Sequence, residues 1–211
     1  VVSLLRFHSK YMKKNNCIRF VIILLVSMSI QAQTKKWTLE ECVKYAIDNN
    51  KEDSAIKRLL LHFSNMDSSE LLLNLNEEMP EELYNDFLYG VDRFIIQNIP
   101  VQHIIGYEYF FGYEFVVNSD VLIPRFETEE LVANVLEQYD DVFNGTDVDV
   151  VDIGTGSGCL AVTLSVEEKG MNVIATDISE KALVVAKQNN NKLGGRVTFY
   201  QGDMLEPVKA M

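Results

Sequence analysis

The amino-acid sequence predicts an α/β fold in which a parallel β-sheet follows a small helical module and a β-hairpin. Three apolar segments rich in β-branched residues, at 148–153, 172–176 and 196–200, alternate with helix-forming segments, as in parallel sheets. A glycine-rich loop joins the first of these strands to the helix that follows it. The 211 residues are 47% hydrophobic and 24% charged, which is the composition of a globular protein.

The first 50 residues differ from the rest of the chain in charge and in pattern. They contain eight Lys and Arg against three Asp and Glu, whereas the remainder contains eleven against twenty-eight. From Met12, a basic start, an apolar stretch at 20–30 and Ala32 follow one another as in a secretory signal peptide. A buried helix is the alternative for that stretch. Residues 37–50 resemble the start of mature outer-membrane proteins of the TolC type, so we expect residues 1–50 to be a foreign segment.

Charge and cysteine content argue against two kinds of site. The acidic remainder disfavours binding to the phosphate backbone of nucleic acids, which relies on Lys and Arg. The three cysteines, Cys17, Cys42 and Cys159, lack the spacing of metal ligands, and no metal site is expected. Cys159 is expected to be a reduced, buried small apolar residue.

Residues 51–100 are expected to form the helical module. Asp53 or Ser54 starts a first helix, a capping signal at 67–70 starts a second, and Pro80 suits the first turn of a third. The apolar faces of these helices predict a small core, with a docking surface for a protein substrate as the alternative.

Residues 101–124 are expected to be a linker that contains the β-hairpin, and 125–211 the α/β domain. The segment 107–117 is aromatic and β-branched around Gly112, which predicts two short strands and a turn. After Pro124, Glu127 or Thr128 is expected to start the next helix.

The candidate binding site is the loop Gly-Thr-Gly-Ser-Gly at 154–158, between the first parallel strand and a helix that begins at Cys159. Glycines let the backbone approach a ligand closely because they carry no Cβ. Asp177 ends the second strand and Asp203 follows the third. Both therefore lie at the edge where open α/β sheets bind ligands.

These features favour S-adenosylmethionine over a dinucleotide. The loop has Gly-x-Gly-x-Gly spacing, not the dinucleotide Gly-x-Gly-x-x-Gly. Asp177 is placed to accept hydrogen bonds from ribose hydroxyls, and Asp152 to neutralise the cationic amino group of the methionine end. Asp177 as a helix cap and Asp203 as a turn residue are the alternatives, and Met204 faces the adenine or fills the core. The expected cofactor-binding residues are Asp152, Gly154, Thr155, Gly156, Ser157, Gly158, Asp177, Asp203 and Met204.

Residues 53–211 resemble the HemK/PrmC family, whose members methylate the glutamine side-chain amide of bacterial release factors. The similarity rests on Pro-Val-Gln-His-Ile-Ile-Gly at 100–106, Val-Leu-Ile-Pro-Arg-Phe-Glu-Thr-Glu at 121–129, and the segment 152–158. Phe126 stands where the family has proline. The resemblance implies an incomplete Rossmann-like S-adenosylmethionine-dependent methyltransferase domain, preceded by a helical substrate-recognition domain and a β-hairpin.

The resemblance also implies a reaction: methyl transfer to the glutamine of the Gly-Gly-Gln motif of peptide chain release factors. The setting would be cytoplasmic, with no membrane and no direct nucleic-acid partner. The family aligns the amide nitrogen with an Asn-Pro-Pro-Tyr segment, by orientation and electrostatics. That segment does not occur up to Met211, so no catalytic residue is assigned and we expect this polypeptide to lack useful activity. The alternatives are a methyltransferase of a ribosomal-protein glutamine or a nucleic-acid base, and a non-enzymatic exported fragment.

Overall fold

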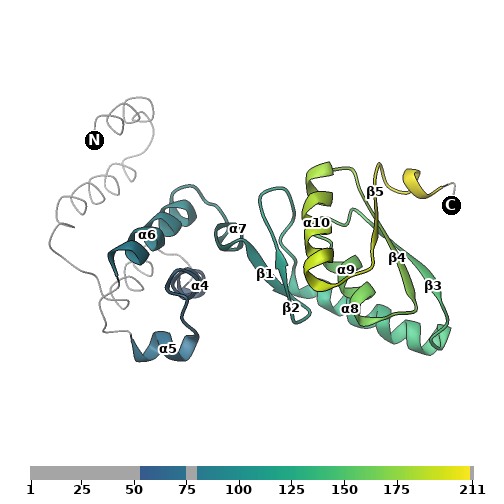
Figure 1. Cartoon of the computed structure of the whole chain (residues 1–211), viewed down its shortest axis with the longest axis horizontal. Helices are drawn as coiled ribbons and strands as arrows, with labels where there is room; N and C mark the ends of the chain where they lie inside the picture. Colours follow the sequence, from purple (N-terminus) through teal and green to yellow (C-terminus); the bar gives the residue numbers. More distant parts are fainter. Residues whose placement is uncertain (1–52, 75–79, 210–211) are drawn as a thin grey trace. The chain divides into compact units, whose positions relative to one another are not determined.

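The computed structural model describes residues 53–74 and 80–209, and the chain divides into two compact units, Val1–Phe87 and Leu88–Met211 (Figure 1). The signal-like stretch and the TolC-like stretch both lie outside the described residues. Among the described residues there is no helix with the length and apolarity needed to cross a membrane.

The first unit is helical, as the sequence predicts. It contains α4 (Asp53–Ser64), α5 (Ser68–Leu73) and the first part of α6 (Glu81–Ile95). Ile56, Leu59 and Leu60 recur at helical spacing and are fully buried, which gives α4 one apolar face. All three expected helices are confirmed.

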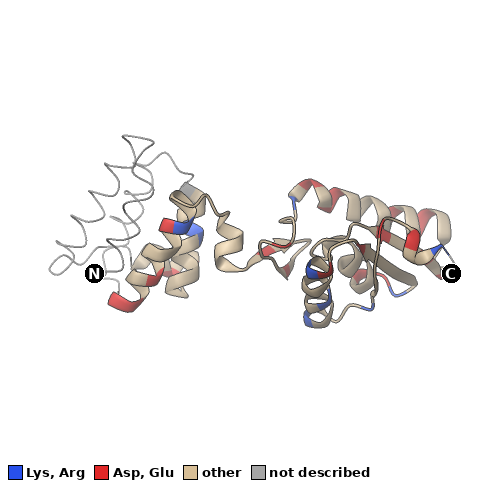
Figure 2. Ribbon diagram, turned by 90° about the horizontal axis from the view of Figure 1, so that it is seen from above, with Lys and Arg blue, Asp and Glu red and all other residues tan. Residues whose placement is uncertain are grey.

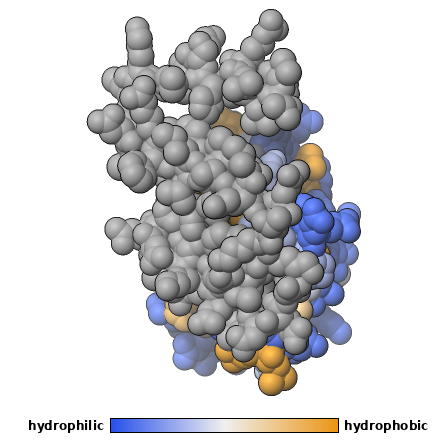
Figure 3. All heavy atoms as spheres, turned by 90° about the vertical axis from the view of Figure 1, so that its left-hand side faces the viewer, coloured by the Kyte–Doolittle hydropathy of each residue, from blue (hydrophilic) through white to orange (hydrophobic). Residues whose placement is uncertain are grey.

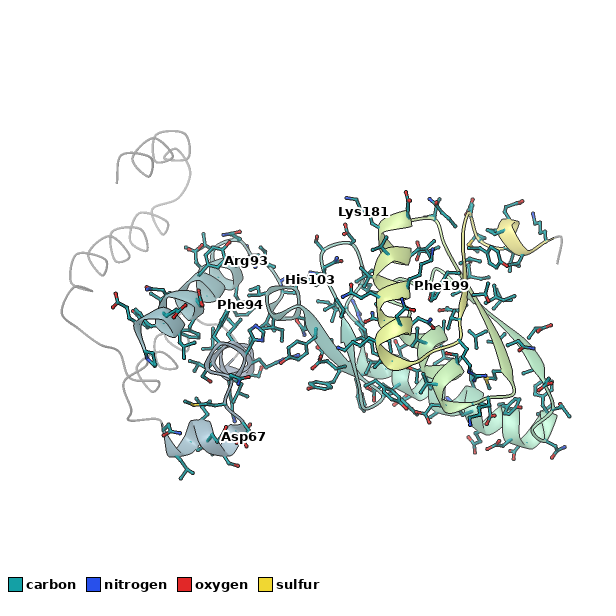
Figure 4. All side chains as sticks on the ribbon, in the orientation of Figure 1. Asp67, Arg93, Phe94, His103, Lys181 and Phe199 are labelled. Carbon is teal, nitrogen blue, oxygen red and sulfur yellow. The ribbon has the colours of Figure 1, made fainter. Side chains whose placement is uncertain are left out.

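A capping box starts α5. The Asp67 carboxylate, labelled in Figure 4, accepts hydrogen bonds from the backbone N–H groups of Ser69 (2.7 Å) and Glu70 (2.8 Å). The Glu70 carboxylate in turn accepts from the Asp67 N–H at 3.0 Å. Figure 3 shows hydrophobic groups at the surface among hydrophilic ones. Leu72 and Leu73 of α5 are exposed, at 62% and 84%.

The second unit begins with the rest of α6, a short helix α7 (Val101–Ile105) and the hairpin of β1 (Tyr107–Phe110) and β2 (Tyr113–Val116). The hairpin is confirmed, whereas α7 was not anticipated from the sequence. The two turn residues, Phe111 and Gly112, both have positive φ, 51° and 79°, as tight hairpin turns require. The side chains of Phe110 and Phe115 meet edge to face with ring centroids 5.9 Å apart, and both are buried in the core of this unit.

The sheet consists of three parallel strands in the order β3 (Val148–Ile153), β4 (Met171–Asp177) and β5 (Thr198–Gln201). The crossover helices are α9 (Cys159–Glu167) and α10 (Glu180–Leu193). In the strand register Ile153 pairs with Thr176 and Asp177 pairs with Gln201, which aligns the carboxyl ends of the strands. The Rossmann-like α/β fold class is confirmed for the residues that the structure describes.

Two local expectations were wrong. The first strand was expected to be buried, yet half-buried and exposed residues alternate along β3, and Val151 and Ile153 are each 39% exposed. The reason is position, since β3 is an edge strand within the described sheet. The helix after the hairpin was expected to start at Glu127 or Thr128. Instead α8 (Phe126–Gln138) starts directly after the extended Arg125, without a side-chain cap.

Helix α8 continues into η1 (Tyr139–Phe143), a π-helical turn, and η2 (Glu206–Val208) follows β5. The Tyr139 side chain is buried, and its hydroxyl donates to the backbone oxygen of Thr146 at 3.0 Å. Figure 2 shows acidic residues along α8 and basic residues on α10.

Candidate cofactor-binding site

The glycine loop after β3 is held against β4 by its own backbone. The N–H groups of Gly154 and Thr155 both donate to the backbone oxygen of Thr176, at 2.8 and 3.0 Å. Gly154, Gly156 and Gly158 have φ values of 75°, 57° and 80°, a region that side chains disfavour. The alternating glycines are therefore required by the path of the loop.

Gly158 is also required by packing. A Cβ at this position would lie 3.1 Å from Cβ of Ala186 on α10 and 3.2 Å from Cγ2 of Val162 on α9. The loop therefore passes close to both crossover helices at this residue.

The side chain of Asp177 fastens the middle of the loop. One carboxylate oxygen accepts from the Gly156 N–H at 2.9 Å and the other from the Ser179 N–H at 2.9 Å. Ser179 itself is the N-cap of α10, with its hydroxyl accepting from the Ala182 N–H. Asp177 therefore holds the glycine loop as well as the start of α10, and is not only a helix-capping residue. Because an ionised carboxylate offers about four acceptor sites, it retains capacity for ligand hydroxyls.

Asp152 lies on β3 near the base of the loop and carries a buried acceptor without a partner. Its Oδ2 atom is buried and accepts no hydrogen bond from the described residues. Burial raises the pKa of Asp152, the nearby Thr155 hydroxyl and the backbone of Ala161 lower it in part, and the Asp177 carboxylate raises it slightly. A buried carboxylate oxygen of this kind is stabilised by a cation or by a strong hydrogen-bond donor.

The side chains of Thr155 and Ser157 are turned into the protein. They are 6% and 2% exposed, and the Oγ1 atom of Thr155 is buried without a partner among the described residues. The loop therefore offers a ligand mainly its backbone.

The turn after β5 completes the same edge of the sheet. The Gly202 N–H donates to the backbone oxygen of Asp177 at 3.0 Å, which brings this turn to the end of β4. Asp203 is exposed. Met204 is 64% exposed, so it does not fill the core, and its backbone oxygen accepts from the buried Thr176 hydroxyl at 3.0 Å.

Sequence reasoning missed Ile178, which follows Asp177 and is 71% exposed. An isoleucine is costly to leave in water at such a position, and with Met204 it gives this edge an apolar component. The signal available in the sequence was an apolar residue placed between a strand-end carboxylate and a helix cap.

Elsewhere in the described residues there is no metal-ligand cluster, and an apolar groove lies away from this edge. No group of His, Cys, Asp and Glu is arranged to hold a metal ion there. A shallow apolar groove lies at the opposite, amino-terminal end of β3 and β4. Its lining residues are Asn134, Val135, Gln138, Tyr139, Phe143, Val148, Asp149, Val150 and Met171.

Comparison with known proteins agrees with the two-part architecture. The family described as methyltransferase small domain matches residues 127–211, and the PrmC N-terminal domain matches residues 36–106. The second match begins within the segment 1–50, and the boundary near residue 50 stays a prediction.

Bacterial relatives of the chain carry a specific name. The release factor glutamine methyltransferase of Bacillus subtilis is 47% identical over 182 residues, which are 82% of this chain and 62% of the relative. The protein of that name from Enterococcus faecalis is 41% identical over 158 residues, 75% of this chain and 55% of the relative. A solved Pyrococcus abyssi tRNA methyltransferase is 18% identical over 46% of this chain and 23% of its own, with a TM-score of 0.37.

The chain spans about 56–62% of the length of the first relatives that it matches. The two family matches, over residues 36–106 and 127–211, include the described helices of the first unit, the start of the linker and the sheet. The chain belongs to the HemK/PrmC family.

Proposed function

We propose that the protein binds S-adenosylmethionine at the carboxyl edge of its sheet and transfers the methyl group to a glutamine side-chain amide of a release factor. The observation that carries the cofactor is the buried Oδ2 of Asp152 at the base of the glycine loop, which has no partner among the described residues. An acceptor in that position fits the cationic amino group at the methionine end of the cofactor.

The other residues of this edge fit the remaining parts of the cofactor. Asp177 would accept hydrogen bonds from the ribose hydroxyls with the acceptor capacity that Gly156 and Ser179 leave unused. Ile178 and Met204 supply exposed apolar surface for the adenine ring, and Asp203 a carboxylate beside it. The glycine loop excludes side chains, so that the ligand can contact the backbone.

The bound cofactor supplies an electrophilic methyl group on its sulfonium sulfur. A glutamine amide nitrogen is a weak nucleophile because its lone pair is delocalised into the carbonyl group. The protein therefore has to orient the amide and stabilise developing charge, and a strong base is not needed. The names and identities of the relatives support a release factor as the substrate, and such a substrate favours the cytoplasm as the location.

Two measurements test the proposal. Calorimetry with S-adenosylhomocysteine should show saturable one-to-one binding by the 211-residue chain. Radiolabelled methyl transfer is then measured with a release factor and with a variant whose Gly-Gly-Gln glutamine is replaced by alanine. Transfer that needs this glutamine supports the full proposal. Binding without transfer supports the cofactor assignment but contradicts the proposed methyl transfer by this chain, and a lack of binding contradicts the cofactor assignment.

A further inference from the structure

Helix α10 contains one fully buried polar side chain on its apolar face. Asn189 is 0% exposed and lies at helical spacing from Ala182, Val185 and Ala186, which are also buried. Burying an amide is unfavourable unless its hydrogen-bonding groups are satisfied. The partners of Asn189 are therefore informative.

Two partners of Asn189 belong to the β-hairpin. Its Oδ1 atom accepts from the N–H of Val116 at 2.7 Å, and its Nδ2 donates to the oxygen of the same residue at 3.0 Å. Val117 donates to Gly106 across the hairpin, so Val116 directs its backbone groups away from β1. The Asn189 amide therefore pairs with the free side of β2, as a residue of a neighbouring strand would.

The third partner belongs to the glycine loop. The second N–H of the Asn189 amide donates to the backbone oxygen of Ser157 at 2.9 Å. Both amide donors are thus used, one on the hairpin and one on the loop. The next residue of the loop, Gly158, packs against Ala186 one turn earlier on the same helix. A single side chain consequently joins the hairpin backbone to the loop backbone.

Two ion pairs that α10 makes with β2 and the segment after it lie nearer the surface. Lys192 of α10 meets Glu114 of β2 at 2.7 Å, and both side chains are more than one third exposed. Lys181, labelled in Figure 4 near the start of α10, lies 3.8 Å from Asp120 and is 79% exposed. Exposed ion pairs hold geometry weakly, whereas buried amide contacts fix it.

We propose that Asn189 is a positioning residue that couples the β-hairpin to the cofactor loop, so that order in one stabilises order in the other. The hairpin lies between the helical module and the sheet in the sequence, and a substrate that reaches it would act on the loop through this amide. The effect on cofactor affinity rests on the proposed function. The mechanical coupling, meaning the link that the Asn189 hydrogen bonds make between hairpin and loop, is independent of the proposed function.

The mechanical coupling is tested without ligand by hydrogen exchange of backbone amides in the full chain. Asn189→Leu removes all three contacts at similar volume, and exchange at both Val116 and Gly158 should rise at least about tenfold together, the factor that about 1.4 kcal/mol corresponds to. Asn191→Leu, at an exposed position of the same helix, should change neither. Val132→Ala weakens the core of the same unit without touching the amide, and should not raise these two amides selectively.

Asn189→Asp gives a graded second variant. It keeps the acceptor for Val116 but loses both donors, so exchange at Gly158 should rise more than exchange at Val116. Unchanged exchange at Gly158 in both folded variants would overturn the coupling. Loss of folding in both would also overturn it, because the role would then be structural only.

A second experiment, with S-adenosylhomocysteine present, distinguishes failure of this inference from failure of the proposed function. S-adenosylhomocysteine should slow exchange at Val116 in the unsubstituted chain, and Asn189→Leu should weaken its binding by about tenfold or more. If the unsubstituted chain binds no S-adenosylhomocysteine, the proposed function fails, and the ligand-free exchange still decides the coupling.

Discussion

The Asp177 carboxylate accepts a hydrogen bond from the backbone N–H of Gly156 over 2.9 Å, so the end of β4 holds the middle of the loop that follows β3. The same carboxylate holds the Ser179 N–H at the start of α10. One side chain thereby ties together three elements around the proposed ligand.

The first prediction concerns this carboxylate. Asp177→Ala should weaken binding of S-adenosylhomocysteine by about 10- to 100-fold, because hydrogen bonds to a charged group contribute about 1.5–3 kcal/mol. Asp149→Ala, at an exposed position of β3, is the matched control and should leave the affinity unchanged. Calorimetric titration measures both, and equal affinities for the two variants would contradict the role of Asp177.

The second prediction concerns pH. Burial, with a contribution from Asp177, raises the pKa of Asp152 above the ordinary value of 3.8, so the folded protein holds this proton more tightly than the unfolded chain. At pH values above the raised pKa, ionised Asp152 therefore lowers the free energy of unfolding. Below pH 3.8 the carboxyl is protonated in both the folded and the unfolded chain, and this destabilisation disappears. Asp152→Asn should stabilise the ligand-free protein at neutral pH and reduce the dependence of stability on pH in that window.

Ligand binding should show the opposite trend at Asp152. A cationic amino group prefers the ionised carboxylate, so the affinity for S-adenosylhomocysteine should rise as pH rises through the pKa of Asp152. In Asp152→Asn the affinity should be lower at neutral pH and flat across the same range. Urea unfolding and calorimetry at several pH values measure the two effects, and a wild-type affinity independent of pH would argue against this contact.

The third prediction concerns the close approach at Gly158. Gly158→Ala should lower the free energy of unfolding by about 2–3 kcal/mol, since the residue has a φ of 80° and its Cβ would press on Ala186. Gly145 has a similar φ of 75°, and a Cβ added there would meet nothing within 4 Å, so Gly145→Ala should cost only about 1 kcal/mol. Urea denaturation measures the free energy of unfolding of both variants. Equal decreases would show that a methyl group at Gly158 fits without pressing on Ala186.

The fourth prediction concerns the helical unit. Asp67→Ala removes the acceptor for two backbone N–H groups at the start of α5 and should destabilise the protein by about 1 kcal/mol. Asp86→Ala, exposed within α6, is the control and should change stability little. A thermal unfolding midpoint that is the same for Asp67→Ala and the unsubstituted chain would show that the cap does not stabilise the fold.

Much of the fold could be predicted because local signals and tertiary packing agree. The capping box at Asp67 and the glycine loop at 154–158 each combine a sequence pattern with the backbone geometry it favours. The start of α8 could not be predicted, because Arg125 leads into the helix without a side-chain cap. The exposure of β3 depends on which strands neighbour it, and the apolar composition of one segment does not contain that information.

The candidate site shows the same division. The placement of Asp152 and Asp177 at one edge of the sheet was predictable because the ends of parallel strands meet there. Asn189 was not, although a polar residue seven positions after Ala182 on an apolar helix face was a usable signal. Its partner Val116 is 73 residues away in the sequence, and only the folded chain brings them together.

The most direct test of the cofactor assignment is a titration of the isotopically labelled chain, followed by NMR at the amides of Gly154, Gly156, Gly158 and Asp177. S-adenosylhomocysteine should shift these four signals in a saturable manner, and NAD at the same concentration should not. Unmoved signals with S-adenosylhomocysteine, or equal shifts with NAD, would contradict the assignment.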